Sequence, residues 1–221
     1  MLIEESIWIT NSIFKNKLDN ISPVLNLGSS SLDFRQRIQP FINENIFMPL
    51  NLKGVKVVHT DIQNDVGVDL VGDLSDKAFV DILKQNHFKT VICSNLLEHL
   101  IDETRVVICK TIDEILMKES LAIITVPRIY PYHEDPIDTW YRPSVNELMM
   151  LFPNFKLIEG SYVKGQDSFF SELKKRPLNM FLSIIKLFIP FYKFSEWKND
   201  IKYLPKWFRR YEVTCIIIMK K

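Results

Sequence analysis

The sequence predicts an α/β protein with a doubly wound, mostly parallel sheet covered by helices on both faces. Short apolar runs alternate with stretches of helical periodicity along most of the 221 residues. The runs are continuously apolar, as in strands buried on both faces. Hydrophobic residues make up 47% of the chain, which is enough for one substantial core. We therefore expect a single domain over residues 1–221, with a helical N-terminal extension over residues 1–22.

Local signals predict each element. Apolar residues near helical spacing indicate a leading helix over residues 4–19. Ser75 and Asp102 are expected to cap two later helices, and Ser144 with Glu147 forms a predicted capping box. The strands are predicted at 23–27, 55–60, 89–93, 121–126 (stopped by Pro127), 155–163 and 212–219, and the helices up to 42, at 75–86, at 102–118 and from 144.

A long, basic and aromatic-rich segment, residues 164–210, separates the last two predicted strands. We expect it to be a helical insertion with one or two helices. Such a segment suits a lid over a substrate, a contact in a homodimer or a core-facing helix. Over residues 174–193 it also suits peripheral contact with a membrane surface. Its apolar stretch is too short and too interrupted to span a bilayer.

Bulk charge and cysteine spacing exclude several classes of function. The net charge of +1 lacks the basic footprint of nucleic-acid-binding proteins. The three cysteines have no C-x-x-C spacing, so neither a disulfide framework nor a metal site is expected. Cys93 and Cys215 fall in apolar runs and are predicted to be buried thiols. Without a secretory signal, a cytoplasmic location is the default expectation, with peripheral membrane contact left open.

The residues that follow the strands are the place to look for a ligand site, because doubly wound sheets bind ligands beyond the carboxyl ends of their strands. The first predicted strand ends in Asn26-Leu27-Gly28-Ser29-Ser30, whose small side chains let backbone N–H groups approach a ligand. An ordinary tight turn would have the same composition.

Polar residues also follow the next predicted strands. Asp61 can accept hydrogen bonds from ribose hydroxyls, or can be a solvated surface carboxylate. Asp73 can accept a hydrogen bond from an adenine amine, or can cap the helix beside Ser75. The Glu98-His99 pair, after Ser94-Asn95, is more often structural than catalytic.

Taken together, these segments resemble the class I S-adenosylmethionine (SAM)-dependent methyltransferases, and most of all the type 11 methyltransferase domain. The resemblance covers roughly residues 23–160 and implies a Rossmann-like, seven-stranded sheet. The matching segments are VLNLGSSSLD, HTDI, VGDLSD, VICSNLLEHLID and ITVPRIYPYHEDPIDTWYRPSVNELMMLF.

The resemblance implies SAM as the cofactor and methyl transfer (EC 2.1.1.-) to a small-molecule, glycan or lipid-linked acceptor. One departure is that Asn26 replaces the family's usual acid, and Ser30 and Leu32 stand where further glycines are common. An inactive methyltransferase-like binding or partner protein is therefore the alternative. A nicotinamide oxidoreductase is disfavoured by the missing G-x-G-x-x-G. The implied cofactor-binding residues are Asn26, Gly28, Ser29, Ser30, Asp61, Ile62, Asp73, Leu74, Ser94 and Asn95.

The loop of residues 128–142 is the predicted acceptor site. We expect His133 to act as a general base or to orient the acceptor, steered by Asp135 or Asp138. The alternative is a well-packed loop in which Asp138 and Arg142 form an internal ion pair. The predicted substrate-binding residues are Tyr130, Tyr132, His133, Trp140 and Arg142.

Overall fold

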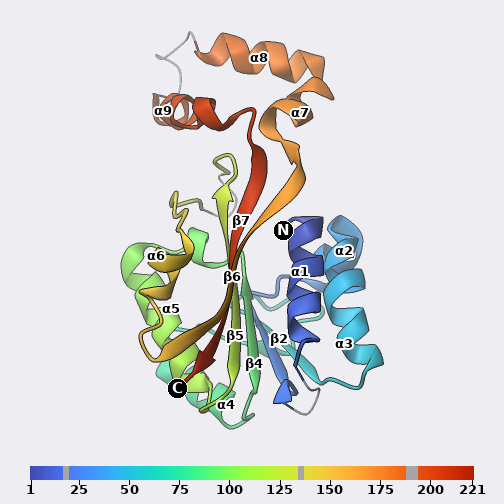
Figure 1. Cartoon of the computed structure of the whole chain (residues 1–221), viewed down its shortest axis with the longest axis vertical. Helices are drawn as coiled ribbons and strands as arrows, with labels where there is room; N and C mark the ends of the chain where they lie inside the picture. Colours follow the sequence, from blue (N-terminus) through green and yellow to red (C-terminus); the bar gives the residue numbers. More distant parts are fainter. Residues whose placement is uncertain (17–19, 134–136, 188–193) are drawn as a thin grey trace.

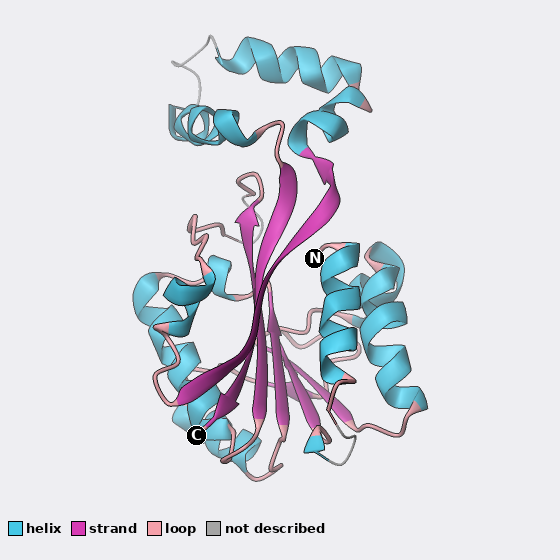
Figure 2. Ribbon diagram, in the orientation of Figure 1, coloured by secondary structure: helices cyan, strands magenta, loops and turns pink. Residues whose placement is uncertain are grey.

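The computed structural model describes residues 1–16, 20–133, 137–187 and 194–221. The strands are β1 (Val24–Leu27), β2 (Val57–Asp61), β3 (Leu70–Val71), β4 (Thr90–Ser94), β5 (Leu121–Ile129), β6 (Phe155–Ser168) and β7 (Arg210–Lys220). Within the described residues they form one seven-stranded sheet in the order β3-β2-β1-β4-β5-β7-β6. The β2–β3, β1–β2, β1–β4 and β4–β5 pairs are parallel, whereas β7 runs antiparallel to both β5 and β6 (Figure 2). The predicted mostly parallel sheet is confirmed, with an antiparallel pair at one edge.

Helices cover both faces of the sheet. Figure 1 shows α1, α2 and α3 on one face and α4, α5 and α6 on the other. Side chains alternate between two apolar cores: in β4, Val91 and Cys93 enter one core and Ile92 the other. The helical elements are α1 (Ile3–Ile13), η2 (Phe34–Ile38), α2 (Pro40–Ile42), η3 (Asn43–Phe47), α3 (Met48–Leu52), α4 (Lys77–Lys84), η4 (Leu97–His99), α5 (Asp102–Ile115), α6 (Val145–Met149), α7 (Phe169–Lys174), α8 (Pro177–Leu187), α9 (Phe194–Tyr203) and η5 (Leu204–Lys206).

Several predicted boundaries are wrong. Strand β5 continues through Pro127 to Ile129, because β4 has ended opposite Thr125 and only β7 still pairs with β5 there. The sequence also missed β3, which is only two residues long. The leading helix ends at Ile13, short of the predicted residue 19.

Two predicted helix caps are displaced by a residue. The carboxylate of Asp76 caps α4 by accepting from the Ala78 N–H, so Ser75 is not the cap. Asp102 lies in the first turn of α5, where it pairs with Arg105 instead of capping the helix. The predicted capping box of Ser144 and Glu147 is confirmed at α6.

Beyond the carboxyl ends of the parallel strands lies a separate helical layer, formed by α7, α8 and α9 (Figure 1). We call residues 169–187 and 194–206 the helical cap. Because β6 extends to Ser168 and β7 begins at Arg210, the flanks of the predicted 164–210 insertion are strand. Three helices are described where one or two were expected. Residues 188–193, part of the segment expected to contact a membrane, lie outside the described residues. None of the described helices is long and apolar enough to cross a membrane.

Candidate functional site

The turn after β1 is joined to the end of β2. Gly28 and Ser30 have φ angles of +64° and +55°, so the backbone turns sharply as soon as the strand ends. The Ser30 N–H donates to Asp61 Oδ2 at 2.8 Å, and the Ser29 N–H donates to the Thr60 carbonyl at 3.0 Å. The structure therefore brings together residues from the first two predicted strand ends.

Arg35 holds this turn in place, and sequence reasoning missed it. Its buried guanidinium donates to the carbonyls of Ser29 at 2.8 Å, Ser30 at 2.5 Å and Gly67 at 2.7 Å. Burial lowers the pKa of Arg35, an effect that the charges of Asp69 and Asp61 oppose. In the sequence Arg35 is one polar residue in a helical stretch, with nothing to indicate that it would bind the turn.

Asn26, the residue in place of the family's acid, is engaged within the protein. Its amide Nδ2 lies 3.1 Å from Nδ1 of His59. Burial lowers the pKa of His59 to about 4, so the ring is neutral near pH 7 and its Nδ1 can accept from the amide. The carboxylate that binds the backbone of the turn at Ser30 therefore comes from Asp61, and the Asn26 side chain binds His59 instead.

The residues predicted to contact adenine differ in their partners and in their exposure to solvent. The Asp73 carboxylate accepts from the N–H and hydroxyl of Ser75 at 2.8 and 2.7 Å, and these bonds lower the pKa of Asp73. Asp73 therefore binds Ser75 in the turn before α4, and the helix cap that the sequence had offered as its alternative role belongs to Asp76. Leu74 packs against the core on the α4–α5 side, whereas Ile62 is 66% exposed beside the end of β2.

At the end of β4, opposite the middle of β5, lies a carboxylate that sequence reasoning also missed. Glu5 of α1 is fully buried and its Oε1 accepts from Asn95 Nδ2 at 2.8 Å and from Thr125 Oγ1 at 2.5 Å. Asn95 directly follows Ser94, the last residue of β4, and has a φ of +50°. The N-terminal helix thus contributes to the predicted cofactor region, although no sequence motif pointed to Glu5.

The loop after β5 is organised around Asp138. This buried carboxylate accepts from the Trp140 N–H at 2.8 Å, lies 2.5 Å from Arg142 Nη2 and lies 3.0 Å from His133 Nδ1. Burial alone would raise the pKa of Asp138, but contacts with His133 and Arg142 hold it well below its usual range. Asp138 therefore stays ionised and orients its neighbours. The other steering candidate, Asp135, lies outside the described residues.

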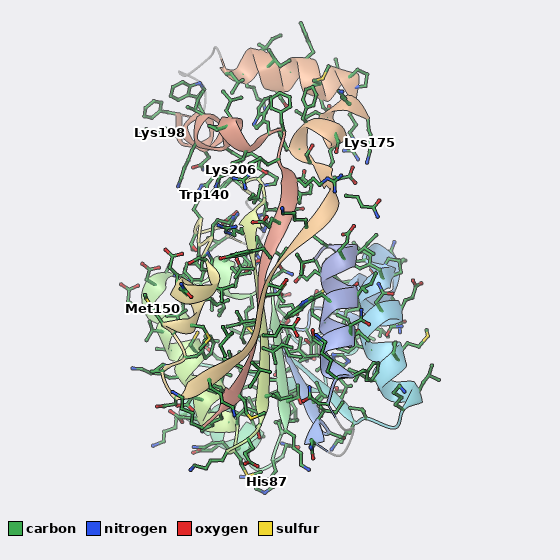
Figure 3. All side chains as sticks on the ribbon, viewed as in Figure 1. His87, Trp140, Met150, Lys175, Lys198 and Lys206 are labelled. Carbon is green, nitrogen blue, oxygen red and sulfur yellow. The ribbon has the colours of Figure 1, made fainter. Side chains whose placement is uncertain are left out.

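Aromatic rings line the same loop. The Tyr130 ring centroid is 4.8 Å from that of Tyr211, and Tyr132 stacks on Trp140 at 5.7 Å. Trp140 donates from Nε1 to Asn199 of α9 at 2.8 Å and lies between the sheet and the helical cap (Figure 3). The predicted substrate residues are thus gathered between the strand ends and the cap.

Three buried polar atoms near Arg142 lack a hydrogen-bond partner within the described residues. They are Glu98 Oε2, Arg142 Nε and Tyr203 Oη. The charge of Arg142 acts on both Glu98 and Tyr203, which places the three groups in one neighbourhood. Burial raises the pKa of Glu98 to about 8, so this side chain is mostly protonated at pH 7. Unpaired buried polar atoms are rare, and a polar ligand would satisfy them.

The turn after β1 is closely packed against the segment after β4. A Cβ at Gly28 would lie 3.0 Å from Leu96 Cδ1. Asp61 holds a carboxylate at the neighbouring strand end, and Asn95 lies at the next. These donors and acceptors fit a ligand with ribose hydroxyls and an amino-acid end.

Solved structures with this architecture include SAM-dependent methyltransferases. One from Anabaena variabilis aligns with a TM-score of 0.57 at 7% identity, over 100% of this chain and 86% of that one. The chain has the class I methyltransferase fold. MccD protein aligns with a TM-score of 0.53 at 14% identity, over 98% of this chain and 96% of that one.

Coclaurine N-methyltransferase, solved with N-methylheliamine and S-adenosylhomocysteine (SAH), aligns with a TM-score of 0.51 at 13% identity, over 97% of this chain and 69% of that one. At such identities the likeness to methyltransferases is one of fold. No family model and no curated protein matches the chain.

Proposed function

We propose that this chain is a SAM-dependent methyltransferase acting on a small-molecule acceptor. The observation that carries the proposal is the position of two sites at one end of the sheet. One is the turn after β1, which is tied to Asp61; the other surrounds Arg142, where three buried polar atoms lack a partner among the described residues. When bound, SAM supplies an activated methyl group on a sulfonium. The protein must therefore hold two reactants in line and exclude water.

The cofactor would be held by backbone and side chains at three strand ends. Gly28 and the two serines after it leave room for the amino-acid end, Asp61 suits the ribose, and Ile62 with Leu74 offers apolar surface to adenine. Asn95 and Ser94 lie beside the buried Glu5 carboxylate, which favours a cationic ligand in this region.

His133 is the proposed base or orienting residue. Asp138 lies 3.0 Å from its Nδ1 and would fix the ring while remaining ionised. In this proposal Asp138 is a positioning residue and does not exchange a proton. Tyr130, Tyr132, Trp140 and Arg142 would frame the acceptor, whose polar groups would satisfy Arg142 Nε.

Finer features of the function remain separate proposals. The acceptor can be a free small molecule, a glycan or a lipid-linked compound. A cytoplasmic location, a homodimer and peripheral membrane contact are proposals of the same kind. The second candidate function, a methyltransferase-like partner protein without activity, rests on Asn26, which contacts His59 where the family has an acid.

Calorimetry on the purified chain tests the proposal. We expect SAM and SAH to bind and NAD to give no signal. Gly28→Val should abolish binding of both ligands, because a β-branched residue strains a φ of +64° and crowds Leu96. Gly54→Val is the matched control: its φ is +74° but nothing lies within 4 Å of a Cβ there. If the wild-type chain binds neither SAM nor SAH, the methyltransferase proposal is wrong.

Turnover of an accepted substrate tests the role of His133. At saturating SAM we expect His133→Asn to lower kcat by about 10²-fold or more, the usual contribution of an acid–base group. His87→Asn is the control, since His87 lies at the opposite end of the molecule (Figure 3) and Asn tolerates its φ of +50°. Near wild-type kcat in His133→Asn would remove His133 from the chemistry.

A further inference from the structure

The outward face of α8 is apolar and exposed. Leu178, Phe181 and Leu182 are 69%, 60% and 47% exposed, and the helix has no buried residue. Their i, i+3, i+4 spacing places them on one side of the helix. Met180 and Leu187 pack against the cap's own apolar cluster from the other side. The helix is therefore apolar on two sides, and only one of them has a partner in the described structure.

This face lies at one extremity of the molecule. Figure 1 shows α8 as the part of the helical cap farthest from the sheet. The loop with Trp140 lies on the inner side of the same cap (Figure 3). A large flat partner could thus reach α8 without meeting the layers of the sheet.

Charge is divided unevenly between this end and the rest of the chain. Residues 164–210 contain 11 basic residues (Lys and Arg) and four acidic ones (Asp and Glu). The rest of the chain contains 17 basic and 23 acidic residues. The near-zero net charge of the whole chain hides this division. The exposed basic residues of the helical cap and of the segment that leads into β7 are Lys174, Lys175, Arg176, Lys186, Lys198, Lys202, Arg209 and Arg210.

We propose that the helical cap docks on the surface of an anionic lipid bilayer, with the outward face of α8 entering the interface. An exposed apolar strip flanked by basic side chains is the pattern of interfacial helices. With 11 residues, α8 is too short to span a bilayer. A second copy of the chain would bring like charges together, and a nucleic acid would leave the apolar strip exposed. The inference goes beyond methyl transfer and does not depend on it.

Flotation of the full chain with vesicles tests the proposal. We expect binding to vesicles of 70% phosphatidylcholine and 30% phosphatidylserine, and little to phosphatidylcholine alone. Raising the salt concentration should weaken binding. The double variant Leu178→Ser/Phe181→Ser should reduce partitioning at least tenfold. Arg176→Gln should reduce it about fivefold, the usual contribution of one basic residue near such a surface.

Matched controls distinguish binding through α8 from nonspecific adsorption of exposed apolar residues to vesicles. Leu52→Ser/Met150→Ser removes two residues that are 81% and 77% exposed on the sheet domain, and should leave partitioning unchanged. Circular dichroism of each variant checks that it is folded. The proposal is overturned if the wild-type chain does not float with anionic vesicles, or if the α8 variant floats as well as the wild type. It is also overturned if light scattering shows a dimer that the α8 variant dissociates while vesicles are not bound.

Discussion

Glu5 is a buried carboxylate whose described partners are all neutral. Its oxygens accept from Asn95, Thr125 and the Leu2 N–H. Ionised carboxylates are rarely buried without a compensating charge. A ligand with a positive charge would supply that compensation, and the end of β4 is where such a ligand is proposed to lie.

We expect Glu5→Gln to weaken SAM binding more than SAH binding. SAM carries a sulfonium charge that SAH lacks, and a carboxylate in a poorly solvated region acts on it over several ångströms. Calorimetry with both ligands measures the affinity for SAM relative to that for SAH. This ratio should be about tenfold lower in Glu5→Gln than in the wild type. Glu4→Gln makes the same charge change one residue earlier, outside the buried region. A ratio unchanged by Glu5→Gln would show that Glu5 is only structural.

Glu98 gives the chain a pH-dependent stability. Burial raises its pKa from 4.5 to about 8, so between these values the folded state holds a proton that the unfolded state has lost. The contribution of Glu98 to the free energy of unfolding therefore falls as pH rises through this window, by up to about 1.4 kcal/mol per pH unit. His59, whose pKa burial lowers to about 4 from 6.5, acts in the opposite direction below pH 6.5.

Urea unfolding at pH 6.5, 7.2 and 8 checks this prediction, because the His59 effect is small in that range and is the same in the wild type and in a Glu98 variant. Glu98→Gln keeps the shape of the side chain without the titration. It should be more stable than the wild type at pH 8, with a smaller difference at pH 6.5. A difference that does not vary with pH would mean that Glu98 titrates normally.

At the scale of elements, the turn after β1 depends on a residue that the sequence does not single out. Arg35, in a π-helical turn, joins that turn to the loop before β3 through Gly67. Periodicity predicted a helical stretch here. The choice of which polar side chain points inward depends on the wider π-helical turn, which periodicity does not specify.

We expect Arg35→Met to destabilise the protein by about 3 kcal/mol and to weaken SAM binding more than tenfold. Three carbonyls would lose their charged donor, and each such bond contributes about 1.5–3 kcal/mol. Thermal unfolding and calorimetry measure the two effects. Arg37→Met should change stability by about 1 kcal/mol or less, because Arg37 pairs with Asp33 in solvent. Equal effects of the two substitutions would contradict the assigned role of Arg35.

Strand and helix identity were predicted better than their ends. The long apolar runs identified six strands, whereas β3, with two residues, has no apolar run of its own. Pro127 wrongly predicted the end of β5. Whether a proline ends a strand depends on which strands pair with it at that residue, and at Pro127 only β7 pairs with β5. The Ser144 capping box was predictable since all its contacts lie within four residues.

At the scale of the whole molecule, the helical cap lies beyond the end of the sheet that carries the predicted sites (Figure 1). The cap has a small cluster of its own, with Leu173, Tyr203 and Trp207, and Trp140 of the acceptor loop packs against it. Movement of the cap would therefore alter the environment of the acceptor loop. The outward side of the same cap carries the exposed apolar and basic surface.

The sequence by itself determined the sheet and the strand ends at which a cofactor is proposed to bind. Apolar runs, small-residue turns and acids after strands are local patterns, and parallel strands bring their carboxyl ends to one edge. Only the tertiary structure decided which distant side chains complete the site. Glu5 lies 90 residues from Asn95 and 120 from Thr125 in the chain. Such contacts depend on how helices pack across the sheet, and no short sequence pattern encodes that packing.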